Sequence, residues 1–285
     1  MMDLTAIRSA IRTATGSCPD GPPEPVAGGC INDAFRLGDT FVKTNHPAKH
    51  AMFAAEELGL RAIEESGTVR VPAVLASGTT ADCAFLVLEF LPLAGSTRAS
   101  QEDLGRRLAA MHRVTSGAFG WSDPNFIGAT PQPNPRTASW VEFYRDHRLR
   151  HMLELATARG FAFTGTADLL DAVGGFFPAG EPVPSLLHGD LWGGNASALA
   201  DGTPVVFDPA AYFGDREADL AMTALFGGFG PEFYAAYDEA WPRDDGHHQR
   251  QMLYNLYHIL NHAVLFGGGY AAQAQRMIDS LLAIR

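Results

Sequence analysis

The sequence predicts an α+β protein made of two lobes, a small one built on an antiparallel sheet and a larger, mostly helical one. Three observations predict this class. Residues 1–90 mix short apolar strand patterns with helical patterns, and residues 91–96 then form a short segment with proline and glycine. Beyond this segment, apolar residues recur at helical spacing almost to the end of the chain. We therefore expect an N-terminal lobe over residues 1–91 and a C-terminal lobe over residues 92–285.

The N-terminal lobe is expected to have the order helix, hairpin, helix and two strands. Gly38-Asp39 favours a tight turn between two apolar runs, which predicts the hairpin. Met52, Leu60 and Ile63 fall on one stripe of the second helix. The expected ranges are a helix over 3–14, the hairpin over 31–44, a helix over 48–66, and strands at 74–75 and 85–88.

The C-terminal lobe is expected to consist mainly of helices. Residues 247–266 have the clearest apolar face, formed by Leu253, Leu256, Leu260 and Val264. A loop over 115–138 is rich in proline, glycine and asparagine, and ordered loops of that length are usually functional or well packed. The expected helices cover 100–114, 139–159, 166–177, 215–226, 231–240, 247–266 and 270–284.

Composition and charge exclude several classes of protein. The net charge of −11 argues against a nucleic-acid partner, because binding phosphate backbones needs clustered lysine and arginine. The sequence contains no run of 18 apolar residues, so no membrane span is expected. The N-terminus lacks the pattern of a signal peptide. The three cysteines show neither metal-type spacing nor a paired framework, so a reduced cytoplasmic protein is expected. The oligomeric state cannot be read from this sequence.

Residues 187–195 read Leu-His-Gly-Asp-Leu-Trp-Gly-Gly-Asn and carry the strongest functional signal. Asp190 precedes Asn195 by five positions, and Asp208 follows the apolar run 205–207, which suggests a buried strand that carries this carboxylate to a cleft. Kinase-type phosphoryl transfer uses a carboxylate to orient the attacking hydroxyl, and an asparagine and a later aspartate to hold Mg²⁺. We therefore predict Asp190 as the catalytic base and Asn195 and Asp208 as Mg²⁺ ligands. The alternative is a glycine-rich turn with local hydrogen bonds, which the combination of all three residues disfavours.

Lys43 is the predicted anchor for the phosphates of ATP. It lies within an apolar strand pattern, where a lysine must reach solvent or find an anion. Glu56 shares the stripe of the second helix that faces apolar surroundings, so it needs a cation and is the predicted partner of Lys43, with its neighbour Glu57 as the alternative. Gly28 and Gly29 could let the backbone lie over the phosphates, although a plain turn explains them equally well.

Three further features are candidate parts of the site. The strand end Glu89-Phe90-Leu91 is expected to meet the adenine edge through its backbone, although Glu89 could be an ordinary strand-end charge. Cys30 lies in the glycine segment and is either a redox-sensitive thiol or, as we favour, a small buried apolar group. The acidic segment 215–220 suits the start of a helix, and Asp215 in it could attract an amine-bearing acceptor. Asp219 could brace the catalytic loop from below.

At these residues the chain resembles the fructosamine kinase family, which is related to aminoglycoside phosphotransferases and choline kinases. The Trp and double Gly of 187–195 are specific to this group. So are Tyr-Phe-Gly-Asp-Arg-Glu-Ala-Asp-Leu-Ala-Met-Thr at 212–223 and Leu-Phe-Gly-Gly-Phe at 225–229. Leu-Asn-His at 260–262, Leu-Phe-Gly-Gly-Gly-Tyr at 265–270, Gly-Gly-Cys-Ile at 28–31 and Asn-Phe-Ile-Gly at 125–128 also look like the family. The resemblance covers nearly the whole chain.

The resemblance implies a protein-kinase-like fold and ATP-dependent phosphorylation of the 3-hydroxyl of ketosamines, free or protein-linked, in deglycation repair. By matching position it implies the roles already given for Asp190, Asn195, Asp208, Lys43 and Glu56. It also implies that Trp192 lines the acceptor cleft, where an indole face suits a sugar or an ammonium group. His262 is expected either to reach the same cleft or to be a buried structural histidine.

Two other functions remain as alternatives. A kinase for an aminoglycoside or an amino alcohol would use the same catalytic residues, but Trp192-Gly193-Gly194, with the Gly-Gly-Phe segment at 227–229 and the Gly-Gly-Gly-Tyr segment at 267–270, favours ketosamines. A nucleotide-binding pseudokinase is disfavoured because Lys43, Asp190, Asn195 and Asp208 are all present, whereas a protein that only binds nucleotide could lose Asp190. The sequence does not distinguish fructosyl, ribulosyl and erythrulosyl acceptors.

Overall fold

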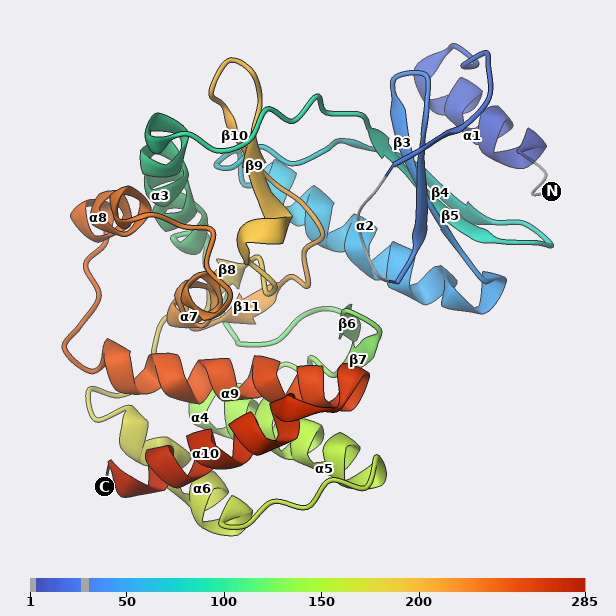
Figure 1. Ribbon diagram of the computed structural model, residues 1–285. Helices are drawn as coiled ribbons and strands as arrows, with labels where there is room; N and C mark the ends of the chain where they lie inside the picture. Colours follow the sequence, from blue (N-terminus) through green and yellow to red (C-terminus); the bar gives the residue numbers. More distant parts are fainter. Residues whose placement is uncertain (1–3, 27–30, 285) are drawn as a thin grey trace.

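A computed structural model describes residues 4–26 and 31–284 (Figure 1). The N-terminal part of the chain forms a five-stranded sheet in which all neighbouring strands are antiparallel. Its strands lie in the order β1-β2-β3-β5-β4. They are β1 (Glu24–Pro25), β2 (Asp33–Leu37), β3 (Thr40–Asn45), β4 (Val74–Thr79) and β5 (Ala84–Glu89).

Two helices cover opposite faces of this sheet, α1 (Thr5–Thr15) and α2 (His50–Glu65). Because side chains alternate along a strand, each strand supplies both faces. Val87 belongs to the core that includes Ile7 of α1. Its neighbours Leu86 and Leu88 belong to the core that includes Phe53 of α2. The α2 face of the sheet therefore looks toward the rest of the molecule, and α2 continues that core into the helical part.

The helical part of the chain is organised around α9, which lies in the lower half of Figure 1 and packs against α5, α7 and α10. The side chains of Leu253, Leu256 and Leu260 on α9 are buried, as their spacing predicted. The helices are α3 (Arg98–His112), α4 (Trp140–Tyr144), α5 (His151–Ala158), α6 (Thr166–Ala172), α7 (Glu217–Leu225), α8 (Pro231–Ala240), α9 (His247–Phe266) and α10 (Gly269–Ala283).

Three short antiparallel pairs connect these helices: β6 (Asn125–Ile127) with β7 (Thr130–Gln132), β8 (Ser185–Leu187) with β11 (Tyr212–Gly214), and β9 (Ala196–Ala198) with β10 (Pro204–Val206). β8 and β9 flank the segment 188–195, and β10 leads to Asp208. These pairs therefore bring the segments of the predicted catalytic site together. No helix among the described residues is long and apolar enough to cross a bilayer.

The helix expected over 139–159 is interrupted, so that expectation was wrong in its middle. A π-helical segment, Arg145–Arg150, separates α4 from α5. It carries Arg148, whose buried guanidinium donates to the carbonyl oxygen of Pro133 at 2.8 Å and to Asn134 Oδ1 at 2.6 Å. The same group lies over the ring of Tyr212, 4.2 Å from its centroid. These contacts fasten the loop 115–138 to the helices, so the loop is well packed.

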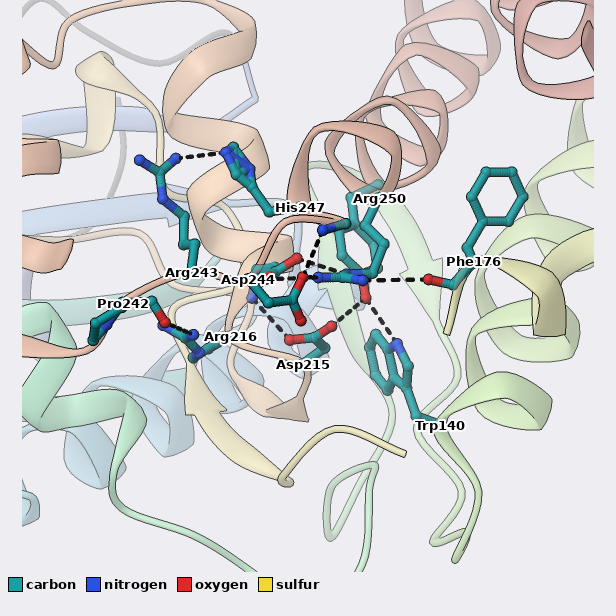
Figure 2. Close-up of polar contacts among 12 residues, drawn as sticks. Trp140, Phe176, Asp215, Arg216, Pro242, Arg243, Asp244, His247 and Arg250 are labelled. Atoms are coloured by element: carbon teal, nitrogen blue, oxygen red, sulfur yellow. Dashed lines mark hydrogen bonds and ion pairs between the residues drawn. The ribbon is translucent and has the colours of Figure 1, made fainter. Parts of the chain in front are cut away.

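A buried ion pair joins the start of α7 to the start of α9 (Figure 2). Arg250 donates to both carboxylate oxygens of Glu217, at 2.7 and 3.1 Å, and also contacts Asp244. The side chains of Arg250 and Glu217 are only 6% and 7% exposed. Nearby, Tyr254 donates a 2.5 Å hydrogen bond to Asp215. Burial and the adjacent Glu217 raise the pKa of Asp215 to about 6.

Replacing Arg250 with methionine should destabilise the protein strongly, because Glu217 would keep its burial and lose its cation. Breaking one side of a buried pair typically costs about 3–5 kcal/mol. Urea unfolding of Arg250→Met measures the loss. Arg61→Met is the matched control, since Arg61 pairs with Glu57 on the surface of α2 and such pairs contribute about 0–1 kcal/mol. Equal stability losses in the two variants would contradict this account of the pair.

Candidate active site

A cleft of about 1030 Å³ lies between the sheet lobe and the helical lobe. Its walls come from β3, α2 and the end of β5 on one side, and from the catalytic segment, α7, α9 and α10 on the other. Most of the residues predicted for the site line it: Lys43, Glu56, Glu89, Phe90, Leu91, Asp190, Trp192, Asn195, Asp208 and His262.

Lys43 connects the two lobes at the floor of the cleft. Its Nζ donates to Glu56 Oε1 at 2.6 Å and also contacts Asp208 Oδ1. Burial alone would lower the pKa of Lys43, but the charges of Asp208 and Glu56 outweigh it and hold the pKa above its usual value. Burial also raises the pKa of Glu56 to about 7, against the opposing effect of Lys43. Glu57, the alternative partner, instead pairs with Arg61.

Asp208 is held in a backbone conformation that few residues other than glycine adopt. Its φ is +58°, and it is the only such residue apart from glycines in the described parts of the chain. The preceding residue, Phe207, donates its N–H to the Asn195 carbonyl oxygen at 3.1 Å. The carboxylate of Asp208 is 44% exposed, whereas its partner Lys43 is 8% exposed. Asp208 therefore faces the open cleft while Lys43 anchors it from behind.

Asn195 and Asp190 are in direct contact. Asn195 Nδ2 donates to the Asp190 main-chain oxygen at 2.9 Å and to Asp190 Oδ2 at 3.3 Å. The Asn195 Oδ1 atom accepts no hydrogen bond from the described residues, so it is available as a ligand. Burial and the nearby negative charge of Asp208 raise the pKa of Asp190 to about 7. The site thus holds a carboxyl group whose proton affinity suits general acid–base chemistry near neutral pH.

The catalytic segment is fixed from below by Asp219 of α7, in the position anticipated for it. Asp219 accepts hydrogen bonds from the backbone N–H groups of His188 (2.7 Å) and Gly189 (2.8 Å), and a third from His112 (3.2 Å). Burial would raise the pKa of Asp219, but these hydrogen bonds and the two histidines hold it below its usual value. His188 in turn reaches the Phe207 carbonyl oxygen at 3.0 Å, which ties the catalytic segment to the segment of Asp208.

The end of β5 presents backbone groups to the cleft. The Leu91 N–H has no hydrogen-bond partner among the described residues, whereas the Phe90 N–H donates to the Asp39 carbonyl oxygen at 3.0 Å. Leu91 is therefore the residue of this segment that can donate to an adenine edge. The side chain of Glu89 is engaged elsewhere, because it pairs with Arg70 and accepts the Ala73 N–H at 3.2 Å.

The structure does not bring Asp215 to the cleft, so its predicted contact with an acceptor amine was wrong. Its side chain is buried, does not line the cleft, and accepts hydrogen bonds from the Glu217 N–H and the Tyr254 hydroxyl; Figure 2 shows it among its polar neighbours. The acidic residues at this charge-dense helix start, Asp215, Glu217 and Asp219, are buried and make internal contacts. The predictions for Gly28, Gly29 and Cys30 lie outside the described residues.

Several cleft residues lie in family-like segments of the sequence but had no predicted role in the site. Phe226, Phe266 and Tyr270 line the cleft beside Trp192 and His262. The loop after Phe226 lies directly on the catalytic segment, because a methyl group added to Gly228 would sit 2.5 Å from the Gly193 Cα. Two glycines facing each other across this contact were visible in the sequence, but their proximity was not.

The donor set fits Mg²⁺ bound together with a nucleotide. The described residues contain no cluster of three His, Cys, Asp or Glu side chains suited to hold a metal alone. Mg²⁺ usually takes one or two protein ligands and completes its shell with phosphate and water oxygens. Asp208 supplies an exposed carboxylate and Asn195 an available amide oxygen, which matches that requirement.

Comparison with known proteins gives consistent results over almost the full chain. The family model described as Fructosamine kinase matches residues 4–284. A protein of Synechocystis sp. named "Probable ketoamine kinase slr1563" is 47% identical over 264 residues, covering 91% of this chain and 90% of the relative. The chloroplastic "Protein-ribulosamine 3-kinase" of Oryza sativa subsp. indica is 42% identical over 268 residues, covering 90% and 78% of the two chains.

Solved structures share the fold. A crystal structure from Thermobifida fusca YX-ER1, provisionally named a fructosamine-3-kinase, has a TM-score of 0.85 and 32% identity and covers 98% of this chain and 99% of the other. The aminoglycoside phosphotransferase APH(4)-Ia in complex with AMP-PNP and hygromycin B has a TM-score of 0.63 at 17% identity, with 98% of each chain covered. The predicted α+β class, with a kinase-like small sheet lobe and a larger helical lobe, is confirmed.

Proposed function

The chain belongs to the fructosamine kinase family, and from this premise we propose that it transfers the terminal phosphoryl group of ATP to the 3-hydroxyl of a ketosamine. The activity is that of an ATP-dependent small-molecule kinase acting on adducts between sugars and amines, with a role in removing such adducts. One observation supports the assignment most directly. Asp190 touches Asn195, and Lys43 joins Glu56 to Asp208, so that all five predicted residues meet in a single cleft.

Each residue has a distinct task in this proposal. The N-terminal lobe, residues 1–91, binds the nucleotide: the Leu91 N–H meets the adenine edge, and Lys43, steadied by Glu56, neutralises phosphate oxygens. The C-terminal lobe, residues 92–285, holds the acceptor. Asn195 and Asp208 would hold Mg²⁺, and the bound Mg²⁺–ATP supplies the phosphoryl group and offsets its charge.

Asp190 orients the acceptor hydroxyl and takes up its proton. A carboxyl with a pKa near 7 is partly ionised at neutral pH and can both accept and release a proton. Asp219 acts only through the backbone, by holding the His188 and Gly189 amides and hence the direction of Asp190. Positioning and charge compensation are the main requirements of phosphoryl transfer.

A panel of acceptors tests this function. ADP release should be stimulated by ribulosyl-lysine or fructosyl-lysine with Mg²⁺–ATP, and NMR of the product should place the phosphate on O3. An aminoglycoside and choline should leave ADP release at its background rate. Stimulation by either of these compounds alone, or a phosphate on another hydroxyl, would refute the proposed substrate class. ATP binding without turnover of any acceptor would instead indicate a nucleotide-binding protein.

A further inference from the structure

Five ring side chains gather at the acceptor end of the cleft, and we call them the aromatic clamp: Trp192, Phe226, His262, Phe266 and Tyr270. His262 is the hub. Its ring centroid lies 4.8 Å from that of Phe226, 5.0 Å from Tyr270 and 5.5 Å from Phe266. Trp192 joins through Phe226, edge-on at 6.4 Å. The rings come from four separate segments, so the fold assembles the clamp.

The clamp leaves large apolar surfaces uncovered. Trp192 and Phe226 are each 39% exposed and Phe266 is 59% exposed, although all three line a cleft that could have been packed shut. Contiguous exposed rings on one surface usually mark a binding site. The edge-on Trp192–Phe226 geometry also leaves ring faces open. Such faces attract cations and repel anions, because the π cloud is negative.

Charges near the clamp also favour a cation. Among the described residues that line the cleft, Lys43 is the only lysine or arginine, and Glu56 and Asp208 engage it. Burial lowers the pKa of His258 to about 3 and also lowers the pKa of His262, so neither histidine supplies positive charge at neutral pH. His262 Nδ1 bonds to the His258 carbonyl oxygen at 2.8 Å, which leaves Nε2 as an acceptor.

Two helices end at the clamp and one, α10, begins there at Gly269 with the partial positive charge of its amino end, so carboxyl ends outnumber amino ends at the clamp. α7 ends at Leu225, next to Phe226, and α9 ends at Phe266. Neither has a basic residue in its last turn, so the partial negative charge of both carboxyl ends is not neutralised there. In a ketosamine the amine nitrogen is bonded to C1, and the carbonyl carbon C2 lies between C1 and C3. A 3-hydroxyl placed at Asp190 therefore brings the ammonium group and its substituent close to Trp192 and the rings beyond it.

We propose that the aromatic clamp binds the ammonium group and the uncharged stem attached to it, and rejects ketosamines that carry a carboxylate near the amine. This inference rests on the proposed function. It predicts a preference for adducts of lysine side chains and of amide-flanked amines over adducts of free amino acids. A carboxylate in the clamp would lose water and meet ring faces and helix carboxyl ends with no cation nearby.

A matched pair of acceptors tests the proposal on the wild-type protein. The ribulosyl adducts of β-alanine and of β-alaninamide differ only in a carboxylate against an amide of nearly the same size. At a pH below the pKa of both amines, we expect kcat/KM to be at least about tenfold higher for the amide adduct, which corresponds to roughly 1.4 kcal/mol. Equal values for the two adducts would overturn the clamp proposal and leave the kinase function intact. If neither adduct, nor ribulosyl-lysine, is phosphorylated, the proposed function itself fails.

Variants of Phe266 assign the effect to the clamp. Phe266→Arg adds the missing cation and should reduce the preference for the amide adduct or reverse it. Leu58→Arg is the matched control, because it adds the same charge at an exposed apolar position of α2 that does not line the cleft, and it should keep the wild-type preference. Phe266→Leu should raise the KM for the amide adduct without raising the KM for ATP. An unchanged preference in folded Phe266→Arg, checked by circular dichroism, would contradict the proposal.

Discussion

Asp190→Asn should lower kcat by about 10²–10⁴-fold while the affinity for ATP stays at its wild-type value. Loss of a positioned general base has effects of this size. The substitution keeps the shape of the side chain and the 2.9 Å hydrogen bond from Asn195 to the main-chain oxygen of residue 190. The catalytic segment should therefore keep its conformation, and only the proton acceptor is lost. Single-turnover kinetics measures the first effect, and calorimetric titration with a non-hydrolysable ATP analogue measures the second.

Asp123→Asn is the matched control for this variant. Asp123 is exposed and does not line the cleft, so the same change of chemistry should leave kcat unaltered there. Near-wild-type turnover of Asp190→Asn would remove Asp190 from the mechanism. A parallel loss of nucleotide affinity would show instead that the carboxylate belongs to the metal and phosphate site.

Lys43→Met should lower kcat/KM for ATP by about 10²–10³-fold, the usual cost of losing one charged donor from a preorganised phosphate site. Lys43 is the single cation that the described cleft residues offer to a triphosphate, and the surrounding site has no substitute. Its removal also leaves Glu56 and Asp208 facing each other without a cation. Because burial already raises the pKa of Glu56 to about 7, that carboxyl can take up a proton and limit the loss of stability.

Lys49→Met serves as the control, since Lys49 is exposed and lies outside the cleft lining. Initial rates at varied ATP concentration give the comparison, and thermal melts of both variants separate a binding defect from a folding defect. Unchanged ATP kinetics in a folded Lys43→Met protein would refute the assigned phosphate anchor.

The sequence predicted those parts of the fold that have strong local signals. Gly38-Asp39 specified the hairpin, and the spacing of Leu253, Leu256 and Leu260 specified the face of α9. Of the three-residue strands around the catalytic segment, only the one before Asp208 was predicted, from the apolar run 205–207 that overlaps β10. The others were missed, because strands of that length show no periodicity. The break in the helix over 139–159 was also missed, because it depends on Arg148 finding Pro133 and Tyr212, which are contacts that only the tertiary structure creates.

The residues of the site likewise fall into those that the sequence could identify and those that it could not. Asp190, Asn195 and Asp208 were identifiable because phosphoryl transfer demands those groups in that order, and the pairing of Lys43 with Glu56 followed from two charged residues on apolar stripes. The predicted contact of Asp215 with the acceptor was wrong, because an acidic helix start has the same sequence pattern whether its carboxylates face solvent or the interior. Phe226, Phe266 and Tyr270 lie in the family-like segments 225–229 and 265–270, but no site role was predicted for them, because single aromatic residues at helix ends give no sign of meeting in space.

The contact between Gly193 and Gly228 limits how this enzyme could be redesigned. Gly193 belongs to the catalytic segment and Gly228 to the loop that follows Phe226, and neither position has room for a side chain. Changes to residues 226–230 made to admit a new acceptor would therefore also disturb the turnover machinery. The segment after α9 is less restricted: the positive φ of Gly267 and Gly268 favours glycine at those two positions, but a Cβ added at Gly269 would meet no atom within 4 Å. Libraries that seek new acceptors should accordingly start at Phe266 and Tyr270 and leave the 226–230 segment untouched.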